Sequence, residues 1–96
     1  MKVSDITEKD LADYARVDIT DTIEYGFFKA AFIAAKNYIM GRTGISEEEL
    51  NEHEEFSIAI FCLVADMYDN RSINAEGSEP NRTVEAIINM HDKNFL

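Results

Sequence analysis

A run of thirteen residues at positions 56–68, FSIAIFCLVADMY, constrains the fold more than any other part of the chain. Only Ser57 and Asp66 in it are polar, and a helix that is apolar on every side must be covered on every side. At ~1.5 Å per residue the run is about 20 Å long, whereas a bilayer-spanning helix needs about 20 apolar residues. We therefore expect the central helix of a small bundle, or a helix that another subunit partly covers.

Charge and composition exclude several classes of function. With 19 acidic and 9 basic side chains among 96 residues, the formal net charge is −10, and such a surface repels nucleic-acid phosphates. Specific DNA binding is therefore not expected, although DNA that only slides past an acidic wall is compatible with this charge. The hydrophobic content of 46% indicates one globular domain. The first residues, MKVSDITEKDL, lack the apolar segment of a secretory signal, so we expect a cytoplasmic protein.

Helical periodicity and capping residues predict an all-α fold, a small bundle of four to five helices around the central apolar helix. Thr7 and Asp10 resemble a capping box that opens a short helix ending near Val17. Ser46 and Glu49 form a second such signal, which opens a short acidic helix. Further helices are expected at residues 22–42, 54–70 and 82–92, with a long polar loop at 72–81 before the last helix.

The helix expected at 22–42 has two neighbouring apolar strips. The first comprises Ile23, Phe27, Ala30, Ala31, Ala34, Tyr38 and Ile39, and the second comprises Phe28, Phe32 and Ala35. The alanines are small, so another helix can approach closely along them. Gly44 suits the left-handed position that ends many helices. In the last helix, the face expected to be apolar holds Val84, Ile87, Ile88 and His91.

A calcium loop is suggested by Asp18, Thr20 and Thr22, but the spacing does not fit. An EF-hand needs Gly at its sixth position and Glu at its twelfth. Counted from Asp18, those positions hold Ile23 and Lys29. The sequence therefore predicts no calcium site here.

Other metal and catalytic motifs are also missing. A carboxylate di-metal bundle needs Glu-x-x-His on two helices, but Leu50 and Ile88 stand three residues before His53 and His91. The one cysteine, Cys62, lies in the apolar run and is expected to be buried and unreactive. There is no glycine-rich phosphate loop and no basic cluster. We expect no enzymatic activity, no cofactor and no metal.

Arg71 follows the most apolar helix and has two interpretations. Its charge suits the negative end of the helix dipole. Alternatively, its guanidinium binds a carboxylate of another helix or another subunit with two hydrogen bonds. The sequence does not decide between these roles, but the second would make Arg71 part of an interface.

Three segments resemble the small head–tail connector proteins of long-tailed bacteriophages and their prophages, also described as DNA-packaging adaptors. The first is AAFIAAKNYIMGRTGI, and the second is AIFCLVADMYDNRS, which closes on Tyr-x-x-Arg at Tyr68 and Arg71. The third is a polar loop containing Pro80, followed by TVEAIINM. The motif positions in the first segment are Ala35, Tyr38, Ile39, Thr43 and Gly44. The acidic stretch SEEELNEHEEF and the pair His91 and Lys93 depart from the family pattern.

The resemblance implies an all-α structural subunit of a homo-oligomeric ring of roughly twelvefold symmetry. Such a ring docks on the portal protein at the head vertex, extends the DNA channel, and joins the head to the next connector or a tail-completion protein. DNA would pass through without specific binding, and neither a membrane nor catalysis is involved. The implied location is the head–tail junction of the virion, and the host cytoplasm before assembly.

The segment between the last two helices is the predicted interface. A ring needs a contact between two different surfaces of neighbouring subunits, and a long loop can reach a neighbour. The predicted contact residues are Arg71, Ser72, Ile73, Asn74, Ala75, Glu76, Gly77, Ser78, Glu79 and Pro80.

A second class of function fits the same acidic composition. A small acidic interaction protein, such as a DNA-mimicking inhibitor or an antitoxin-like regulator, would bind one basic partner through its carboxylates. Ring formation favours the connector, and tight binding to one basic enzyme favours the inhibitor.

Overall fold

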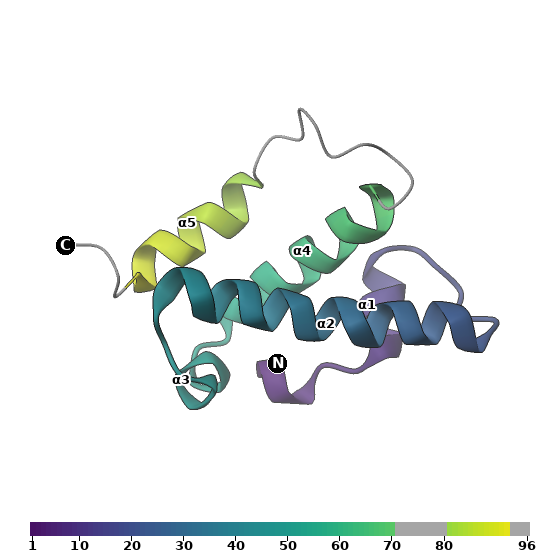
Figure 1. Ribbon diagram of the computed structural model, residues 1–96, viewed down its shortest axis with the longest axis horizontal. Helices are drawn as coiled ribbons and strands as arrows, with labels where there is room; N and C mark the ends of the chain where they lie inside the picture. The colour runs from purple at the N-terminus through teal and green to yellow at the C-terminus, as the bar shows by residue number, and fades with distance from the viewer. Residues whose placement is uncertain (71–80, 93–96) are drawn as a thin grey trace.

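A computed structural model describes residues 1–70 and 81–92 and confirms the all-α fold (Figure 1). Within these residues there is no strand, and the helices pack against one another in one small bundle. The elements are the 3-10 helix η1 (Val3–Asp5) and the α-helices α1 (Glu8–Tyr14), α2 (Thr22–Thr43), α3 (Glu47–Glu52), α4 (Glu55–Asn70) and α5 (Arg82–His91). The bounds expected for α2, α4 and α5 are confirmed to within one or two residues, and α3 begins directly after Ser46 as expected.

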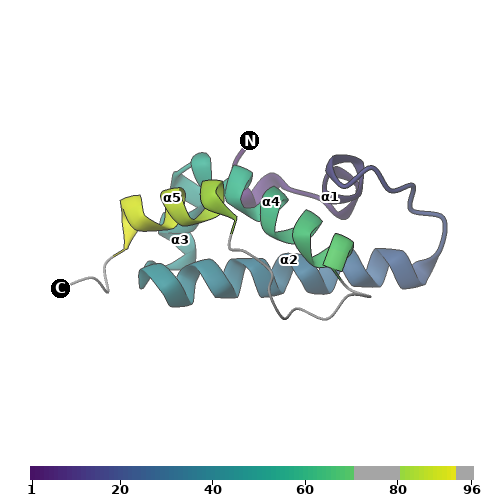
Figure 2. The same cartoon turned by 90° about the horizontal axis from the view of Figure 1, so that it is seen from above.

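The bundle is a thin slab with two layers. Its extents are 44 × 32 × 17 Å, and one helix with its side chains is already about 10 Å across. Figure 2 shows α2 along one side of the slab, with α1, α4 and α5 along the other. In a slab of two layers each helix can bury one face and keeps another face toward solvent.

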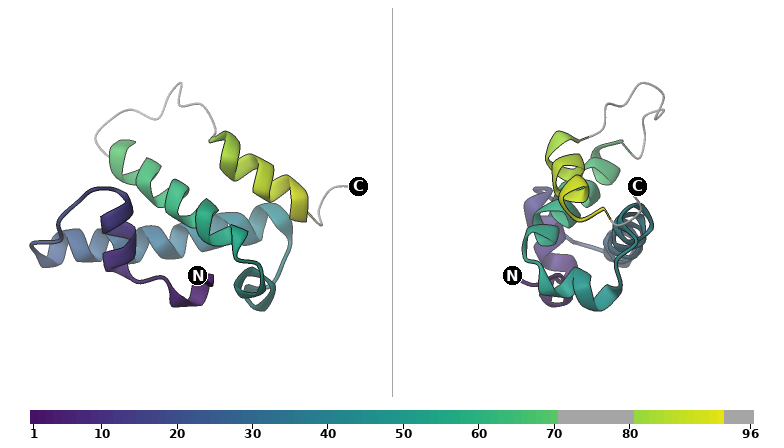
Figure 3. Two further views of the ribbon diagram at one scale, coloured as in Figure 1. Left: turned by 180° about the vertical axis from the view of Figure 1, so that it is seen from behind. Right: turned by 90° about the vertical axis from the view of Figure 1, so that its left-hand side faces the viewer.

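The helix α4 is the central helix, as predicted, but it is not covered on every side. It packs against η1, α1, α2 and α5, and Figure 3 shows it between α1 and α5. Its inner face, which includes Phe56, Ile60 and Val64, is fully buried. On its outer face Ile58 is 53% exposed, and Leu63 is only half-buried. Complete burial of the apolar run is therefore wrong for the single chain, and cover by another subunit stays a prediction.

The first helix ends earlier than Val17 because the backbone turns at Arg16. This residue has a φ of 62°, in the left-handed region that normally favours glycine. The Val17 N–H donates to the Ala12 carbonyl and the Arg16 N–H to the Asp13 carbonyl, which is the Schellman pattern of a helix end. The capping box at the start is present as expected, since Thr7 and Asp10 exchange hydrogen bonds.

Local signals explain the ends of the longest helix. The Asp21 carboxylate accepts from the Glu24 N–H and begins α2, and Gly44 ends it with a φ of 77°. Next to it, the buried Thr43 hydroxyl donates to the Ile39 carbonyl. Ser46 then caps α3 through the Glu49 N–H. Thr43 and Gly44 therefore terminate the helix and lie inside the fold.

The N-terminal segment belongs to the core, which the sequence pattern did not indicate. Val3 and Ile6 are buried although they lie outside any periodic helix, and η1 packs against α3 and α4. The Ser57 hydroxyl donates to the Met1 carbonyl, which ties this segment to α4. A short apolar pair has no periodicity of its own, so only its packing identifies it.

Aromatic contacts hold the far end of α4 to α2. The Tyr68 ring stacks on Phe28 at 5.5 Å between centroids and meets Phe27 edge-on at 5.7 Å. Tyr68 thus has a packing role.

Cys62 is half-buried, in contrast to the expected deep burial, and its Sγ lies 3.6 Å from the Tyr14 hydroxyl. That hydrogen bond raises the pKa of the Tyr14 phenol.

Candidate subunit interface

The face of α2 that points away from the bundle is exposed, and an uncharged stripe runs along it beside the exposed Lys29. Its residues recur at helical spacing and form what we call the outer α2 stripe: Ile23, Gly26, Ala30, Ile33, Ala34 and Asn37. Ile23 is 81% exposed and Ile33 is 54% exposed. On a chain with a net charge of −10, a solvent-facing surface without a charge along most of a 22-residue helix calls for an explanation.

The opposite face of α2 is the one that builds the core. Phe28, Ala31, Ala35 and Ile39 are buried there, three or four residues apart. The sequence analysis had placed Ile23, Ala30 and Ala34 on one apolar strip with residues such as Ala31 and Ile39. That grouping is wrong, because the two-layer slab divides the apolar residues of α2 between an inner and an outer face. Both faces of α2 are apolar, whereas only one of them contacts the bundle.

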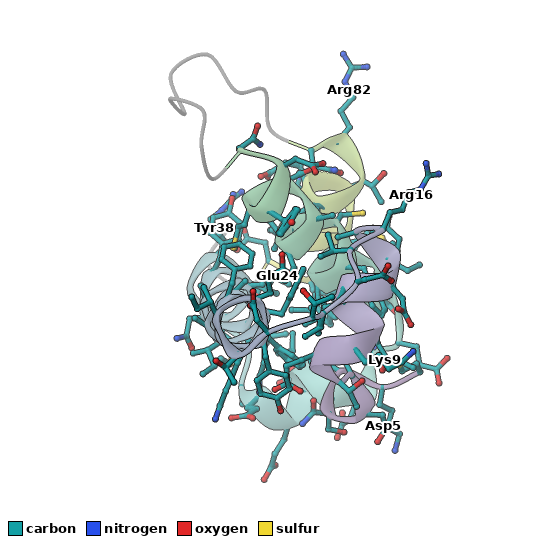
Figure 4. All side chains as sticks on the ribbon, turned by 90° about the vertical axis from the view of Figure 1, so that its right-hand side faces the viewer. Asp5, Lys9, Arg16, Glu24, Tyr38 and Arg82 are labelled. Atoms are coloured by element: carbon teal, nitrogen blue, oxygen red, sulfur yellow. The ribbon has the colours of Figure 1, made fainter. Side chains whose placement is uncertain are left out.

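The second layer also exposes apolar side chains. Ile58 on α4 and Met90 on α5 are 53% and 71% exposed. This layer also carries charged side chains that extend into solvent, and Figure 4 shows two of them, Arg16 and Arg82. The described residues therefore present apolar surface on both layers of the slab, since the outer α2 stripe lies on the other layer.

An ion pair with a tyrosine joins α5 to the end of α2. The Arg42 guanidinium donates to both carboxylate oxygens of Glu85, at 3.1 and 2.9 Å, and to the Tyr38 hydroxyl at 2.7 Å. The Tyr38 hydroxyl in turn donates to Glu85 at 3.2 Å. Hydrogen bonds from Arg42 lower the pKa of the Glu85 carboxyl, and the bonds to Glu85 raise the pKa of Arg42. This arrangement holds the last helix against the longest one.

The sequence suggests an interhelical ion pair at Arg71 and does not indicate the pair of Arg42 with Glu85. Arg42 lies in the last turn of α2 and Glu85 in the first turn of α5, where their charges suit the helix dipoles. That local signal was available, but it does not tell which two helix ends meet. Arg71 and the predicted loop residues 72–80 lie outside the described residues, so their roles stay predictions.

Replacing Arg42 with Ala is expected to lower the melting temperature, because the Glu85 carboxylate loses its two-pronged partner. Arg42→Lys should restore only part of the loss, since an ammonium lacks the planar fork. The pKa of Glu85 is below its ordinary value of 4.5, so the pair stabilises the fold above that pH. Its contribution disappears as the pH falls through the lowered pKa.

The measurement is the melting temperature of parent and variant from pH 7 down to about pH 3, below the ordinary pKa of a glutamate. The difference between the two melting temperatures should shrink as the pH falls below the ordinary pKa of the glutamate. A difference that is unchanged at about pH 3 would show that Arg42 acts through packing and not through the Glu85 charge.

The motif positions of the resemblance serve the fold with one exception. Ala35, Ile39 and Thr43 are buried, and Gly44 ends α2. Tyr38 is 41% exposed and takes part in the contact of Arg42 with Glu85. These positions therefore explain why the helix packs and stops where it does, but they do not by themselves form a binding site.

Acidic side chains gather at the short helix α3. Glu47, Glu48 and Glu52 are exposed, and Glu47 pairs with Lys36 of α2 at 2.9 Å. Glu47 and Glu48 lie in the first turn, where they suit the positive end of the helix dipole. This surface is well solvated and is available to a basic partner.

A cleft lies between α1 and the start of α2. Lys9, Asp13, Asp18 and Tyr25 line it together with apolar side chains. Lys9 and Asp13 form an ion pair at 3.0 Å. The charged groups of this cleft are ordinary surface charges that have partners or contact solvent.

None of the described helices combines the length and the apolar character that crossing a membrane requires. Comparison of the chain with protein-family models, with curated proteins and with solved structures gives no match.

Proposed function

We propose that the chain is a structural subunit of a bacteriophage head–tail junction. It assembles into a ring that docks on the portal protein, extends the DNA channel and joins the head to the next connector or the tail. It carries no catalytic activity. The observation that carries the proposal is the outer α2 stripe, an exposed and uncharged helix face on a strongly acidic protein.

An uncharged face of this kind is suited to contact with another protein. The core of a subunit interface is depleted of charged residues, because removing a charge from water without a partner is costly. The small residues Gly26, Ala30 and Ala34 leave room for a neighbouring helix, and a Cβ atom added at Gly26 would meet nothing within 4 Å. The stripe can therefore receive a packed helix without rearrangement of α2.

A closed ring needs two different apolar surfaces on each subunit. The outer α2 stripe lies on one layer of the slab, and Ile58 and Met90 are exposed on helices of the other layer. We propose that the stripe of one subunit packs against the α4 and α5 side of the next. This contact would also cover the outer face of α4, whose apolar run is too long for the single chain to bury.

The acidic charge fits a wall along which DNA moves. A lumen that carries carboxylates does not bind phosphates, so DNA passes without being held. The partners are copies of the same chain, the portal protein and the next connector or tail protein. The location is the head–tail junction of the virion, and the host cytoplasm before assembly.

The test measures assembly of the purified chain alone and with the portal protein of the same genome. Mass photometry over a range of concentrations, followed by electron microscopy, should show rings with a central hole, formed alone or on the portal. A chain that stays monomeric at high concentration and does not bind the portal would contradict the proposal. Tight binding to one basic enzyme would support the acidic inhibitor instead.

A further inference from the structure

Both histidines of the chain meet one carboxylate at a junction of three helices. His53 directly follows α3, Glu55 begins α4, and His91 ends α5. The His91 Nε2 atom lies 2.7 Å from the Glu55 Oε1 atom, and the His53 Nδ1 atom lies 3.7 Å from the same oxygen. One nitrogen or oxygen atom from each of the three side chains lies within 4.8 Å of the others.

A buried phenylalanine contacts both imidazole rings and lies closer to His91. Phe56 is fully buried, and its ring centroid lies 4.7 Å from that of His91 and 6.1 Å from that of His53. The two imidazole centroids are 4.6 Å apart. The His91 side chain is only 18% exposed, so its position is set by packing. His91 is therefore pre-organised, whereas the His53 side chain is 41% exposed.

We propose that His53, Glu55 and His91 bind a single Zn²⁺ ion. Two imidazole nitrogens and one carboxylate oxygen are donors that zinc prefers, whereas calcium and magnesium prefer oxygen alone. Zinc ligands at 2.0–2.2 Å in tetrahedral geometry lie about 3.3 Å from one another. Two of the three separations, 2.7 and 3.7 Å, are on either side of that value, and all three ligand atoms lie within 4.8 Å of one another, so the side chains must shift to close on the ion.

A simple ion pair explains only part of this arrangement. His91 and Glu55 form a good hydrogen bond. The His53 Nδ1 atom, at 3.7 Å, is too far from the Glu55 carboxylate to form a hydrogen bond with it. A metal ion between the three groups would use both histidines at once. The Glu-x-x-His spacing of a metal-binding bundle does not detect this cluster, because its three ligands come from separate segments of the chain.

A bound zinc ion would connect α3, α4 and α5, with water in the fourth position. Ile88, one turn before His91, is already buried in the core. The metal would in addition fix the C-terminal end of α5 at His91. This inference does not depend on the ring, because all three ligands belong to one chain.

The experiment uses the full chain after treatment with EDTA, and zinc alone as the probe. Isothermal titration should give one zinc ion per chain, and the melting temperature should rise with added zinc. Cobalt, as a spectroscopic substitute, should give the visible absorption of a tetrahedral site, and calcium or magnesium should bind neither measurably nor competitively. Absence of zinc binding, or of the cobalt spectrum, would overturn the proposal.

Variants separate this site from weak binding to the acidic surface. His53→Gln and His91→Gln should each weaken zinc binding at least about tenfold, because each removes one of three protein ligands. Glu52→Gln removes an exposed carboxylate of α3 close in sequence to the site and should leave zinc affinity unchanged. Circular dichroism without metal checks that every variant folds. If zinc affinity is unchanged in both histidine variants, the ion binds to the general acidic surface. The same follows if Glu52→Gln lowers zinc affinity as much as the histidine variants do.

Discussion

Replacing Ile60 with Asp is expected to unfold the domain, whereas Ile58→Asp on the same helix should leave it folded. Ile60 is fully buried and Ile58 is 53% exposed, although only two positions separate them. A buried carboxylate without a partner costs several kcal/mol, and a small domain has a total stability of only about 5–10 kcal/mol. The same substitution on the outer face keeps its charge in water.

Circular dichroism and thermal melting of the two variants provide the measurement. Ile60→Asp should show little helix signal and no cooperative transition, and Ile58→Asp should melt close to the parent at a concentration where the parent is monomeric. A cooperative, near-parental transition in Ile60→Asp would show that α4 packs with a different face inward. Leu63, which the sequence placed in the core, is only half-buried and should give an intermediate loss.

The substitution Ala34→Arg is expected to abolish ring formation without harming the isolated subunit. Ala34 belongs to the outer α2 stripe, where an arginine would have to leave water unpaired when a neighbour packs on it. A cost of a few kcal/mol corresponds to at least about a hundredfold weaker contact. Arginine is nearly as good a helix former as alanine, so α2 itself should be unaffected.

Mass photometry of the variant, alone and with the portal protein, provides the measurement, and thermal melting confirms the fold. Ser4→Arg is the matched control, because it adds the same charge at an exposed position outside the stripe. It should assemble like the parent. Normal rings from Ala34→Arg would exclude the stripe as an interface, and loss of assembly in both variants would indicate a general effect of charge.

Local patterns determined most of the secondary structure of this chain. The caps at Thr7 and Ser46 and the left-handed Gly44 are short-range hydrogen-bond and backbone effects, so the sequence predicts where those helices begin or end. The helical spacing of the remaining segments is equally local, and the all-α fold follows from it. The early end of α1 at Arg16 is the exception, because nothing in that side chain favours a positive φ.

Only the tertiary structure decided which apolar face became the core and which distant residues meet. In α2 both faces are apolar, and the two-layer packing selected the one that holds Phe28 and Ala35. The contacts of Arg42 with Glu85 and of His53 with His91 join segments far apart in the chain. Such contacts depend on how far each helix is shifted and rotated against its neighbours. No short-range pattern encodes these offsets, because they result from the packing of the whole bundle.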